Sequence, residues 1–186
     1  YTKQGTWREI QDKLIVPKNR LIELTKGSLT LGSLIVEPFS VSHDAADPIG
    51  INVFAGNDKA TIVTDTGVIS DDVLRRIDDT TLLVLEANYD PHMLRFGPYQ
   101  PFLKQRVASD EGHLSNEMAA QALLMMKRPD FMQVILAHRS ENNNNAVLVT
   151  QTIGKMLVDG GVRIGPEMKL QHGQPNEIVS IQSVER

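Results

Sequence analysis

The first part of the chain alternates short apolar segments with turn-forming residues. Apolar residues 29–31 and 34–39 flank Gly32-Ser33, and a two-residue connection that begins with glycine is favoured in tight β-hairpins. Two further apolar runs, 50–55 and 60–64, are separated by the turn-forming sequence Gly-Asn-Asp. These runs follow one another without an intervening helical pattern, so the sequence predicts continuous antiparallel β-structure.

After residue 65 the pattern changes to helices that alternate with strands. Ser70 can cap a short helix, because Val73 and Ile77 then share one helical face. The uninterrupted apolar runs 82–85 and 134–137 are typical of strands that are buried on both faces. This alternation predicts a mixed α/β fold.

Two longer helices and an edge region complete the predicted domain. Ser115 can cap a helix with one apolar stripe, and a second amphipathic helix over residues 148–158 ends at Gly160-Gly161. Three prolines between residues 89 and 112 indicate a loop, and residues 168–184 indicate one or two edge strands. Since no repeat or linker interrupts the chain, we expect a single domain over residues 1–186.

Composition limits the chemistry that this domain can use. It is 41% hydrophobic and 23% charged, with no apolar run of the roughly 20 residues that a membrane helix needs. The absence of cysteine excludes disulfides and thiolate ligands, so His, Asp, Glu or Asn would hold any metal. We therefore expect a cytoplasmic protein that does not enter a membrane. Its net charge of −4 offers no general attraction for nucleic acid, which local groups or metal ions would have to supply.

Polar side chains follow the ends of the predicted strands. His43, Asp65, Asn88 and His138 each come shortly after an apolar run, and the carboxyl ends of strands are where α/β sheets bind ligands. If the strands are neighbours, these side chains converge. Each residue also has a structural explanation: Asp65 can belong to an ordinary turn, and either histidine can simply be hydrogen-bonded within the fold.

Five short segments, taken together, resemble a known family. They are HDAADP at 43–48, TDTG at 64–67, LEAN at 85–88, GHLSN at 112–116 and HRSENNN at 138–144. Their order and spacing resemble the YycJ (WalJ) branch of the metallo-β-lactamase superfamily and, more distantly, ribonuclease Z. The resemblance implies an αββα sandwich, incomplete at its N-terminus.

The family's first metal motif, His-x-His-x-Asp-His, is absent from this sequence, which begins at Tyr1 without a methionine. We expect that motif to lie upstream, and we expect residues 1–6 to form the strand and turn that follow it. The loss of one layer of the sandwich would expose apolar sheet surface. A complementary N-terminal segment or a homo-oligomer is therefore the expected partner.

The resemblance also implies a centre with two divalent ions, zinc or manganese. His43 would bind the first ion, Asp65 would bridge, and His138 would bind the second. His113 is expected to be a catalytic donor or general acid that faces the phosphate rather than a metal ligand. One departure is Arg139, where relatives usually place an apolar residue beside the metal-binding histidine.

The implied activity is that of a metal-dependent phosphodiesterase, a DNA exonuclease that uses a hydroxide activated by two metals. The only cationic cluster close in sequence to a proposed site residue consists of Arg95, Lys104 and Arg106, and we expect it to hold the flanking nucleic-acid backbone. The alternative is an ordinary solvated loop. Two other functions stay open: hydrolysis of a small ester, thioester or lactam, and an inactive fragment that lacks part of its metal site. The residues expected to bind substrate are Asn88, Lys104, Arg106, Ser115, Asn143 and Asn144.

Overall fold

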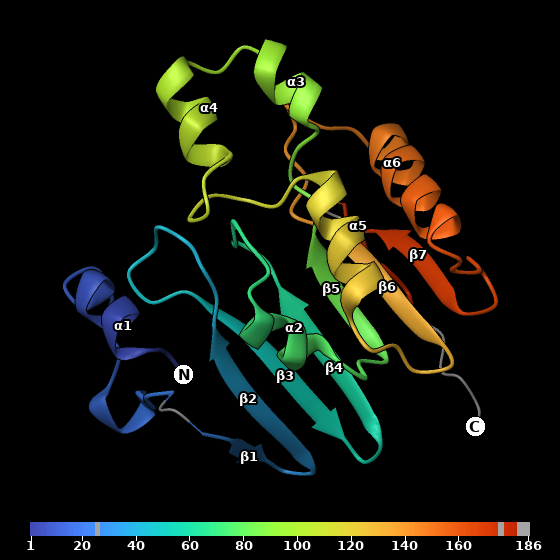
Figure 1. Ribbon diagram of the computed structural model, residues 1–186. Helices are drawn as coiled ribbons and strands as arrows, with labels where there is room; N and C mark the ends of the chain where they lie inside the picture. The colour runs from blue at the N-terminus through green and yellow to red at the C-terminus, as the bar shows by residue number, and fades with distance from the viewer. Residues whose placement is uncertain (25–26, 175–176, 182–186) are drawn as a thin grey trace.

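The computed structural model describes residues 1–24, 27–174 and 177–181. Within these residues the strands form one seven-stranded sheet whose order, β1 to β7, is the order of the chain (Figure 1). Each strand is therefore hydrogen-bonded to the strands that precede and follow it in the sequence. The strands are β1 (Leu29–Leu31), β2 (Leu34–Ser40), β3 (Ile49–Ala55), β4 (Asp58–Val63), β5 (Leu82–Glu86), β6 (Met132–Ala137) and β7 (Met168–His172).

The first four strands are antiparallel, as the sequence predicts. The pairing of Leu31 with Leu34 leaves Gly32-Ser33 as a two-residue turn, and Gly32 has the positive φ of 61° that such turns require. Strands β3 and β4 are joined in the same way, with Gly56 at a φ of 59°. These tight turns place the hairpins at one end of the sheet and direct their longer connections to the other.

Strands β4 to β7 run parallel to one another. Val63 pairs with Leu85, and Glu86 with Ala137, so the carboxyl ends of β4, β5 and β6 lie at one edge. Strand β7 confirms an edge strand in the predicted region. The described residues 177–181 form no further strand, and residues 175–176 and 182–184 lie outside the described part of the chain.

Helices α2 (Asp71–Ile77), α5 (Asn116–Met125) and α6 (Ala146–Asp159) cover one face of the sheet (Figure 1). Their N-termini are capped by Ser70, Ser115 and Asn145, whose side chains accept backbone N–H bonds. The described residues thus hold one sheet and one helical layer of the predicted αββα sandwich. No helix among them has both the length and the apolar character needed to cross a membrane.

No helical layer covers the other face of the sheet among the residues that the structure describes. Side chains alternate along a strand, so Ile62 and Val84 point away from the helices that cover Val63 and Leu85. Ile62 is 42% exposed, and Val84 is only partly buried. The prediction that residues 82–85 are buried on both faces is therefore wrong for this face, whereas all of β6 up to Leu136 is buried.

Two short helices occupy the region predicted as a loop. They are α3 (Pro91–Phe96) and α4 (Pro101–Val107), and each has proline in its first turn. Proline disrupts a helix at an interior position. At the first position it is favoured, because the N–H group that it lacks would have no partner within the helix there. The prediction of a loop was wrong here, because these prolines begin helices and do not interrupt them. We call residues 91–107 the α3–α4 lobe.

The N-terminal residues form a helix instead of the predicted strand and turn. Helix α1 (Gln4–Ile10) and the single 3-10 turn Lys18–Arg20 precede the sheet, and Thr2 makes one isolated bridge to Glu23. Asp47 fixes this segment by accepting a hydrogen bond from the Gly5 N–H at 3.1 Å. Helix α1 is thereby attached to the loop that carries His43.

Candidate metal centre

The three predicted metal ligands lie together at the carboxyl edge of the sheet. Oδ1 of Asp65 is 3.8 Å from Nε2 of His43 and 3.7 Å from Nε2 of His138. They come from three separate connections, after β2, β4 and β6. The sheet makes this possible, because β2, β4, β5 and β6 all run in the same direction and their carboxyl ends lie at the same edge.

The second ring nitrogen of each histidine is held by an oxygen atom. Nδ1 of His43 lies 3.0 Å from the carbonyl oxygen of Gly112, and Nδ1 of His138 lies 2.9 Å from Oε1 of Glu86. Both oxygens are acceptors, so Nδ1 carries the proton and Nε2 offers a lone pair. Two such imidazoles and a carboxylate suit a divalent transition metal, and outer oxygens of this kind orient metal-binding histidines.

Glu86 organises the site, although the sequence analysis assigned it no role. Its side chain is fully buried, and it accepts hydrogen bonds from Nδ1 of His113 at 2.7 Å, Nδ1 of His138, and the N–H of Thr66 at 3.0 Å. Burial acts to raise its pKa, but these hydrogen bonds outweigh burial and lower it, so the carboxylate stays charged. The available signal was an acidic residue that directly ends the apolar run 82–85.

His113 lies between the two predicted histidine ligands. Its ring centroid is 5.0 Å from that of His43 and 5.1 Å from that of His138. Ligand atoms of His43, Asp65 and His113 lie within 4.8 Å of one another. The structure thus places His113 near enough to ligate a metal as well as to face a substrate; the role expected from the sequence stays a prediction.

Two of the predicted ligands have unusual backbone conformations. Asp65 and His138 have φ angles of 55° and 52°, and Asp79 is the one other non-glycine residue with positive φ in the described part of the chain. This left-handed conformation costs most residues with a side chain about 1–2 kcal/mol, and Asp, Asn and His adopt it more readily than the others. Strained backbone of this kind occurs at functional sites, where it aims a side chain that a relaxed turn would point elsewhere. Here it turns both side chains toward the centre.

The loops around the centre approach too closely for side chains at two positions. A Cβ atom on Gly112 would lie 2.2 Å from the carbonyl oxygen of Arg106, and one on Gly67 would lie 2.3 Å from that of Ser109. The N–H of Gly67 also donates to the Ser42 carbonyl oxygen at 2.9 Å. Glycine at both positions allows the loops that carry His43, Asp65 and His113 to pack directly on one another.

A family profile, described as the beta-lactamase superfamily domain, matches residues 1–138. The chain is 32% identical over 186 residues to a protein named exodeoxyribonuclease YycJ from Bacillus anthracis, covering 99% of this chain and 70% of the relative. It is 30% identical over 181 residues to one named exodeoxyribonuclease WalJ from Streptococcus pneumoniae serotype 2, covering 95% and 67%. The chain belongs to the metallo-β-lactamase superfamily. Within it, the chain is YycJ/WalJ-like.

Solved structures agree with this fold. The metallo-β-lactamase fold protein YhfI from Bacillus subtilis superposes with a TM-score of 0.64 at 13% identity, covering 90% of this chain and 60% of that one. Zinc-bound PqqB from Methylobacterium extorquens gives 0.61 at 17% identity, with 92% and 59% covered. This chain therefore spans about three fifths of each solved structure. At these identities the likeness shows the metallo-β-lactamase fold and nothing finer.

Three of the four polar residues predicted to contact substrate, Asn88, Ser115 and Asn144, are hydrogen-bonded within the scaffold of this fold. Asn88 donates to the carbonyl oxygen of His138 at 2.7 Å, and Ser115 caps α5. The amide group of Asn144 bonds to Asn116 and to the Ala87 carbonyl oxygen. These bonds fix the loops that carry His113 and His138.

Asn143 differs from these three. Its side chain is fully buried, and its Oδ1 has no hydrogen-bond partner among the described residues. Its backbone and side-chain nitrogens both lie within 3.4 Å of the Ser140 hydroxyl. Direct substrate contact stays a prediction for all four residues.

The predicted cationic residues lie on the α3–α4 lobe, on helices rather than in a loop. Arg106 makes a two-pronged ion pair with Asp44, in which the guanidinium holds the pKa of the carboxyl below its usual range. Lys104 donates to the carbonyl oxygen of Arg95 at 2.8 Å. Arg106 thus ties the lobe to the residue that follows His43, while its side chain stays 60% exposed.

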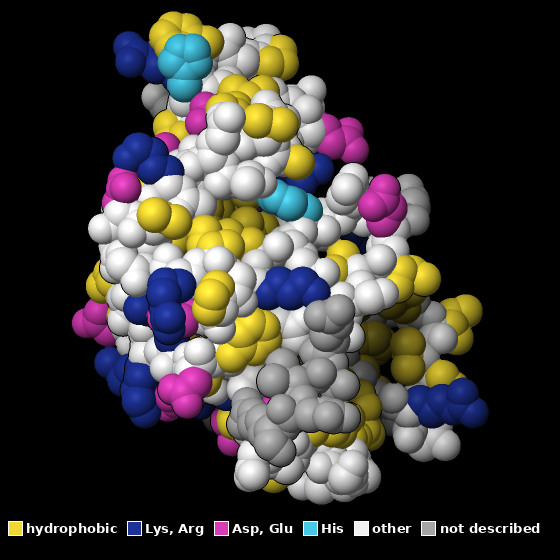
Figure 2. All heavy atoms as spheres, turned by 90° about the vertical axis from the view of Figure 1, so that its right-hand side faces the viewer, with side chains coloured by type: hydrophobic (Ala, Val, Ile, Leu, Met, Phe, Trp, Pro, Cys, Tyr) yellow, Lys and Arg dark blue, Asp and Glu magenta, His cyan; other side chains and the backbone are white. Residues whose placement is uncertain are grey.

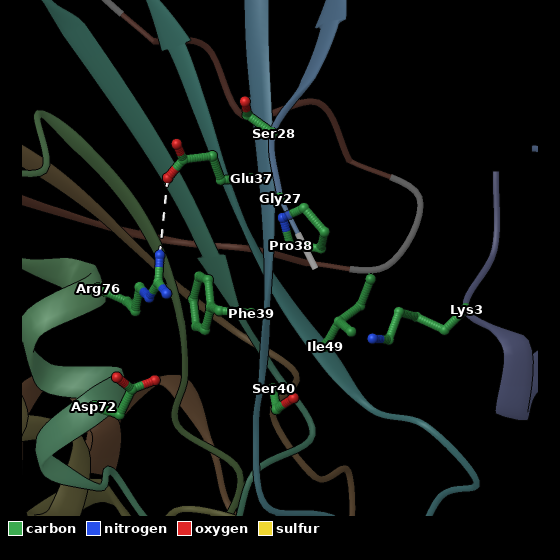
Figure 3. A pocket seen from close by; sticks show the side chains of 10 residues that line it. All are labelled: Lys3, Gly27, Ser28, Glu37, Pro38, Phe39, Ser40, Ile49, Asp72 and Arg76. Atoms are coloured by element: carbon green, nitrogen blue, oxygen red, sulfur yellow. Dashed lines mark ion pairs between the residues drawn. The ribbon is translucent and has the colours of Figure 1, made fainter. Parts of the chain in front are cut away.

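A separate hollow of about 380 Å³ lies beside β2 and shares no residue with the centre (Figure 3). Its charged groups include both signs: Lys3 and Arg76 face a space that Glu37 and Asp72 also line. Arg76 and Glu37 form an ion pair at 3.9 Å across it. Since charges of both signs line the hollow, it presents no field of a single sign to a ligand.

Proposed function

We propose that the protein is a metal-dependent phosphodiesterase, and specifically a DNA exonuclease. The metallo-β-lactamase family supports the coarser statement, a metal-dependent hydrolase. One observation carries the proposal: the Nε2 atoms of His43 and His138 both lie within 3.8 Å of Oδ1 of Asp65. In addition, the Glu86 carboxylate orients both His113 and His138. Two relatives named as exodeoxyribonucleases, each at least 30% identical, support the choice of substrate.

In this proposal His43 and His138 would hold divalent ions, and Asp65 would be the carboxylate that the two ions share. Zinc and manganese both accept this set of nitrogen and oxygen donors. When bound, two such ions would lower the pKa of a water and stabilise the charge that develops on a phosphate under attack. Glu86 and the Gly112 carbonyl oxygen keep the two imidazoles in the tautomer that leaves Nε2 free.

His113 is proposed to donate a proton or hydrogen bond to the phosphate or to the leaving oxygen. Nδ1 of His113 donates to the Glu86 carboxylate, so Nε2 is the nitrogen left to face the centre, and it acts as the donor there when the ring is doubly protonated. Helix α5 begins directly after its cap Ser115, and the dipole of the helix adds a partial positive charge at this end. Together they supply positive potential that the net charge of −4 does not.

The proposal includes a complement that completes the centre. His43, Asp65 and His138 are fewer ligands than two ions require, and Leu34 and Ile62 expose apolar side chains on the uncovered sheet face. We propose that a complementary N-terminal segment, or a second copy of the chain, supplies ligands and covers this face. We also propose a cytoplasmic location, because the chain contains no cysteine and so forms none of the disulfides that are typical of oxidising compartments.

A substrate screen combined with metal analysis tests the proposal. Single- and double-stranded DNA, a phosphodiester dye, a lactam and a thioester are offered in the presence of zinc or manganese. Release of mononucleotides from DNA, together with hydrolysis of the dye, is the expected result. Hydrolysis of the lactam or thioester alone would replace the phosphodiesterase by a small-molecule hydrolase. Two tightly bound metal equivalents on this chain by itself would contradict the need for a complement.

A further inference from the structure

The α3–α4 lobe is a small unit that stands beside the metal centre and apart from the main core (Figure 1). Leu94 and Val107 pack with Tyr89 in an apolar cluster of their own, separate from the cluster between the sheet and α2, α5 and α6. The contacts that attach the lobe to the centre include the ion pair of Arg106 with Asp44 and a hydrogen bond from the backbone N–H of His113 to the Val107 carbonyl oxygen at 2.9 Å. The C-terminal end of α4 is therefore joined to the residues that carry the centre.

The lobe exposes aromatic rings that its own cluster does not use. Phe96 is 67% exposed and Phe102 is 70% exposed. The ring of His92 lies 4.6 Å from the ring of Phe96, and the guanidinium of Arg95 lies 5.3 Å from the same ring. Figure 2 shows histidine, hydrophobic and cationic side chains together at the top of the molecule, where Figure 1 places α3 and α4. Exposed flat rings beside cations are the arrangement on which unpaired bases stack.

The charge of the lobe has the sign that this ligand requires. The chain as a whole has 23 acidic and 19 basic side chains, yet no Asp or Glu occurs from residue 91 to residue 109. Arg95, Lys104 and Arg106 all lie in this stretch. Of these, Arg106 is paired with Asp44, which leaves Arg95 and Lys104 as the cations available to phosphate groups. A protein surface that bound another protein through Phe96 and Phe102 would not need this exclusion of acidic residues.

We propose that the α3–α4 lobe binds the unpaired end of a DNA strand, with bases stacked on Phe96 and Phe102 and phosphates beside Arg95 and Lys104. This inference rests on the proposed nuclease function and gives it a substrate form, a single-stranded end. The strand would pass from the rings along α4 toward His113, so the lobe feeds the terminal phosphodiester to the metal centre. A fully paired blunt end, with its bases stacked in the duplex, gains nothing from the rings.

Fluorescence anisotropy with a labelled oligothymidine tests the inference. The variant combines Phe96→Ala with Phe102→Ala, and its matched control is Met125→Ala, which removes a side chain that is 68% exposed at the far end of α5. Stacking on aromatic rings predicts that the double variant binds the oligothymidine at least about fivefold more weakly for each base that no longer stacks on a ring. The control variant is expected to bind like the wild type. Equal affinity of wild type and double variant would overturn the inference.

An oligonucleotide of abasic sites isolates the bases from the phosphates. It keeps every phosphate but has no bases to stack. The wild type should therefore bind the abasic strand as weakly as the double variant binds oligothymidine, and the double variant should bind both strands with the same affinity. Arg95→Gln should instead lower the salt dependence of binding for both ligands. Equal binding of the abasic and normal strands by the wild type would remove the stacking role.

The phosphodiester dye separates this inference from the function on which it rests. The dye has no stacked bases beyond the scissile group, so its hydrolysis depends on the metal centre and not on the lobe. Dye hydrolysis without any effect of the rings on DNA affinity would reject the lobe and keep the phosphodiesterase. Ring-dependent DNA binding without dye hydrolysis under any metal, with the complement present, would reject the phosphodiesterase and leave a DNA-binding surface.

Discussion

Nδ1 of His138 lies 2.9 Å from Oε1 of Glu86. The same oxygen accepts from Nδ1 of His113 at 2.7 Å, so one buried carboxylate orients a proposed metal ligand and a proposed proton donor. Glu86→Gln removes the charge and turns an N–H₂ donor or a weaker acceptor toward these rings. We expect metal affinity to fall about 10–100-fold, as for other outer partners of metal-binding histidines. Calorimetric titration with zinc or manganese measures this change.

The matched control for Glu86 is Glu141→Gln, which removes one negative charge from an exposed position in the loop after His138. This control should bind metal like the wild type. If Glu86→Gln and Glu141→Gln lower metal affinity equally, a general change in charge, rather than orientation of the histidines, is the cause.

Asp65 combines a proposed bridging role with left-handed backbone, and two substitutions separate these properties. Asn tolerates this conformation, whereas Ala does so at a cost of about 1–2 kcal/mol. Asp65→Asn and Asp65→Ala should both weaken metal binding, but only Asp65→Ala should lower the free energy of unfolding of the metal-free protein. Urea denaturation in a chelator measures the difference. Equal stabilities would show that the backbone at residue 65 relaxes without cost.

Gly112 is the second position at which backbone shape governs the centre. The methyl group of Gly112→Ala would meet the carbonyl oxygens of Arg106 and Val107 at 2.2 and 2.4 Å, so the loop must move. We expect a loss of about 1–3 kcal/mol in stability. The control is Gly154→Ala inside α6, where the nearest atom is 3.8 Å away. There the methyl group should stabilise the helix by about 0.5–1 kcal/mol. Thermal denaturation of both variants compares the two signs.

His172 predicts a pH dependence that does not involve the metal centre. Burial, and then the nearby Arg139 guanidinium, lower its pKa below the usual 6.5. As the pH falls through 6.5, the unfolded chain therefore takes up this proton before the folded protein does. The contribution of His172 is fully present above that pH and is lost below it. We expect His172→Gln to flatten the fall in stability on acidification, measured by urea denaturation from pH 7.5 to 5.

Arg139 gives a direct check on this explanation. Arg139→Leu removes the positive charge but leaves Thr150, whose hydroxyl lies 2.8 Å from Nε2 of His172. The pKa of His172, followed by NMR, should rise toward its usual value. An unchanged titration would leave burial as the only cause.

The sequence predicted the parts of the fold that local chemistry determines. Gly32-Ser33 specified a turn, Ser70 and Ser115 specified helix starts, and the ends of apolar runs located Asp65 and His138. The α3–α4 lobe was missed because proline supports a helix at its first position and opposes one elsewhere, and the sequence alone does not show which position applies. The partial exposure of β5 was missed because burial depends on which layer covers a face.

Glu86 was missed for a different reason. An acidic residue at the end of a buried run is equally consistent with a strand that simply meets solvent there. What distinguishes Glu86 is the arrival of Thr66, His113 and His138 from other connections, and such contacts over 20 to 52 residues of sequence leave no local pattern. A buried acid needs partners, so the burial predicted for its strand was the one usable clue.

The sequential strand order has a consequence for how the protein is made. Chains are synthesised from the N-terminus and begin to fold as they leave the ribosome. Since every strand from β2 onward pairs with the one made just before it, the sheet can grow as the chain emerges, without waiting for a distant partner. The proposed ligands appear in the same order, and His138 is the last. Six of the seven strands are therefore synthesised before the last proposed ligand, so the proposed metal centre is completed only when most of its scaffold has been made.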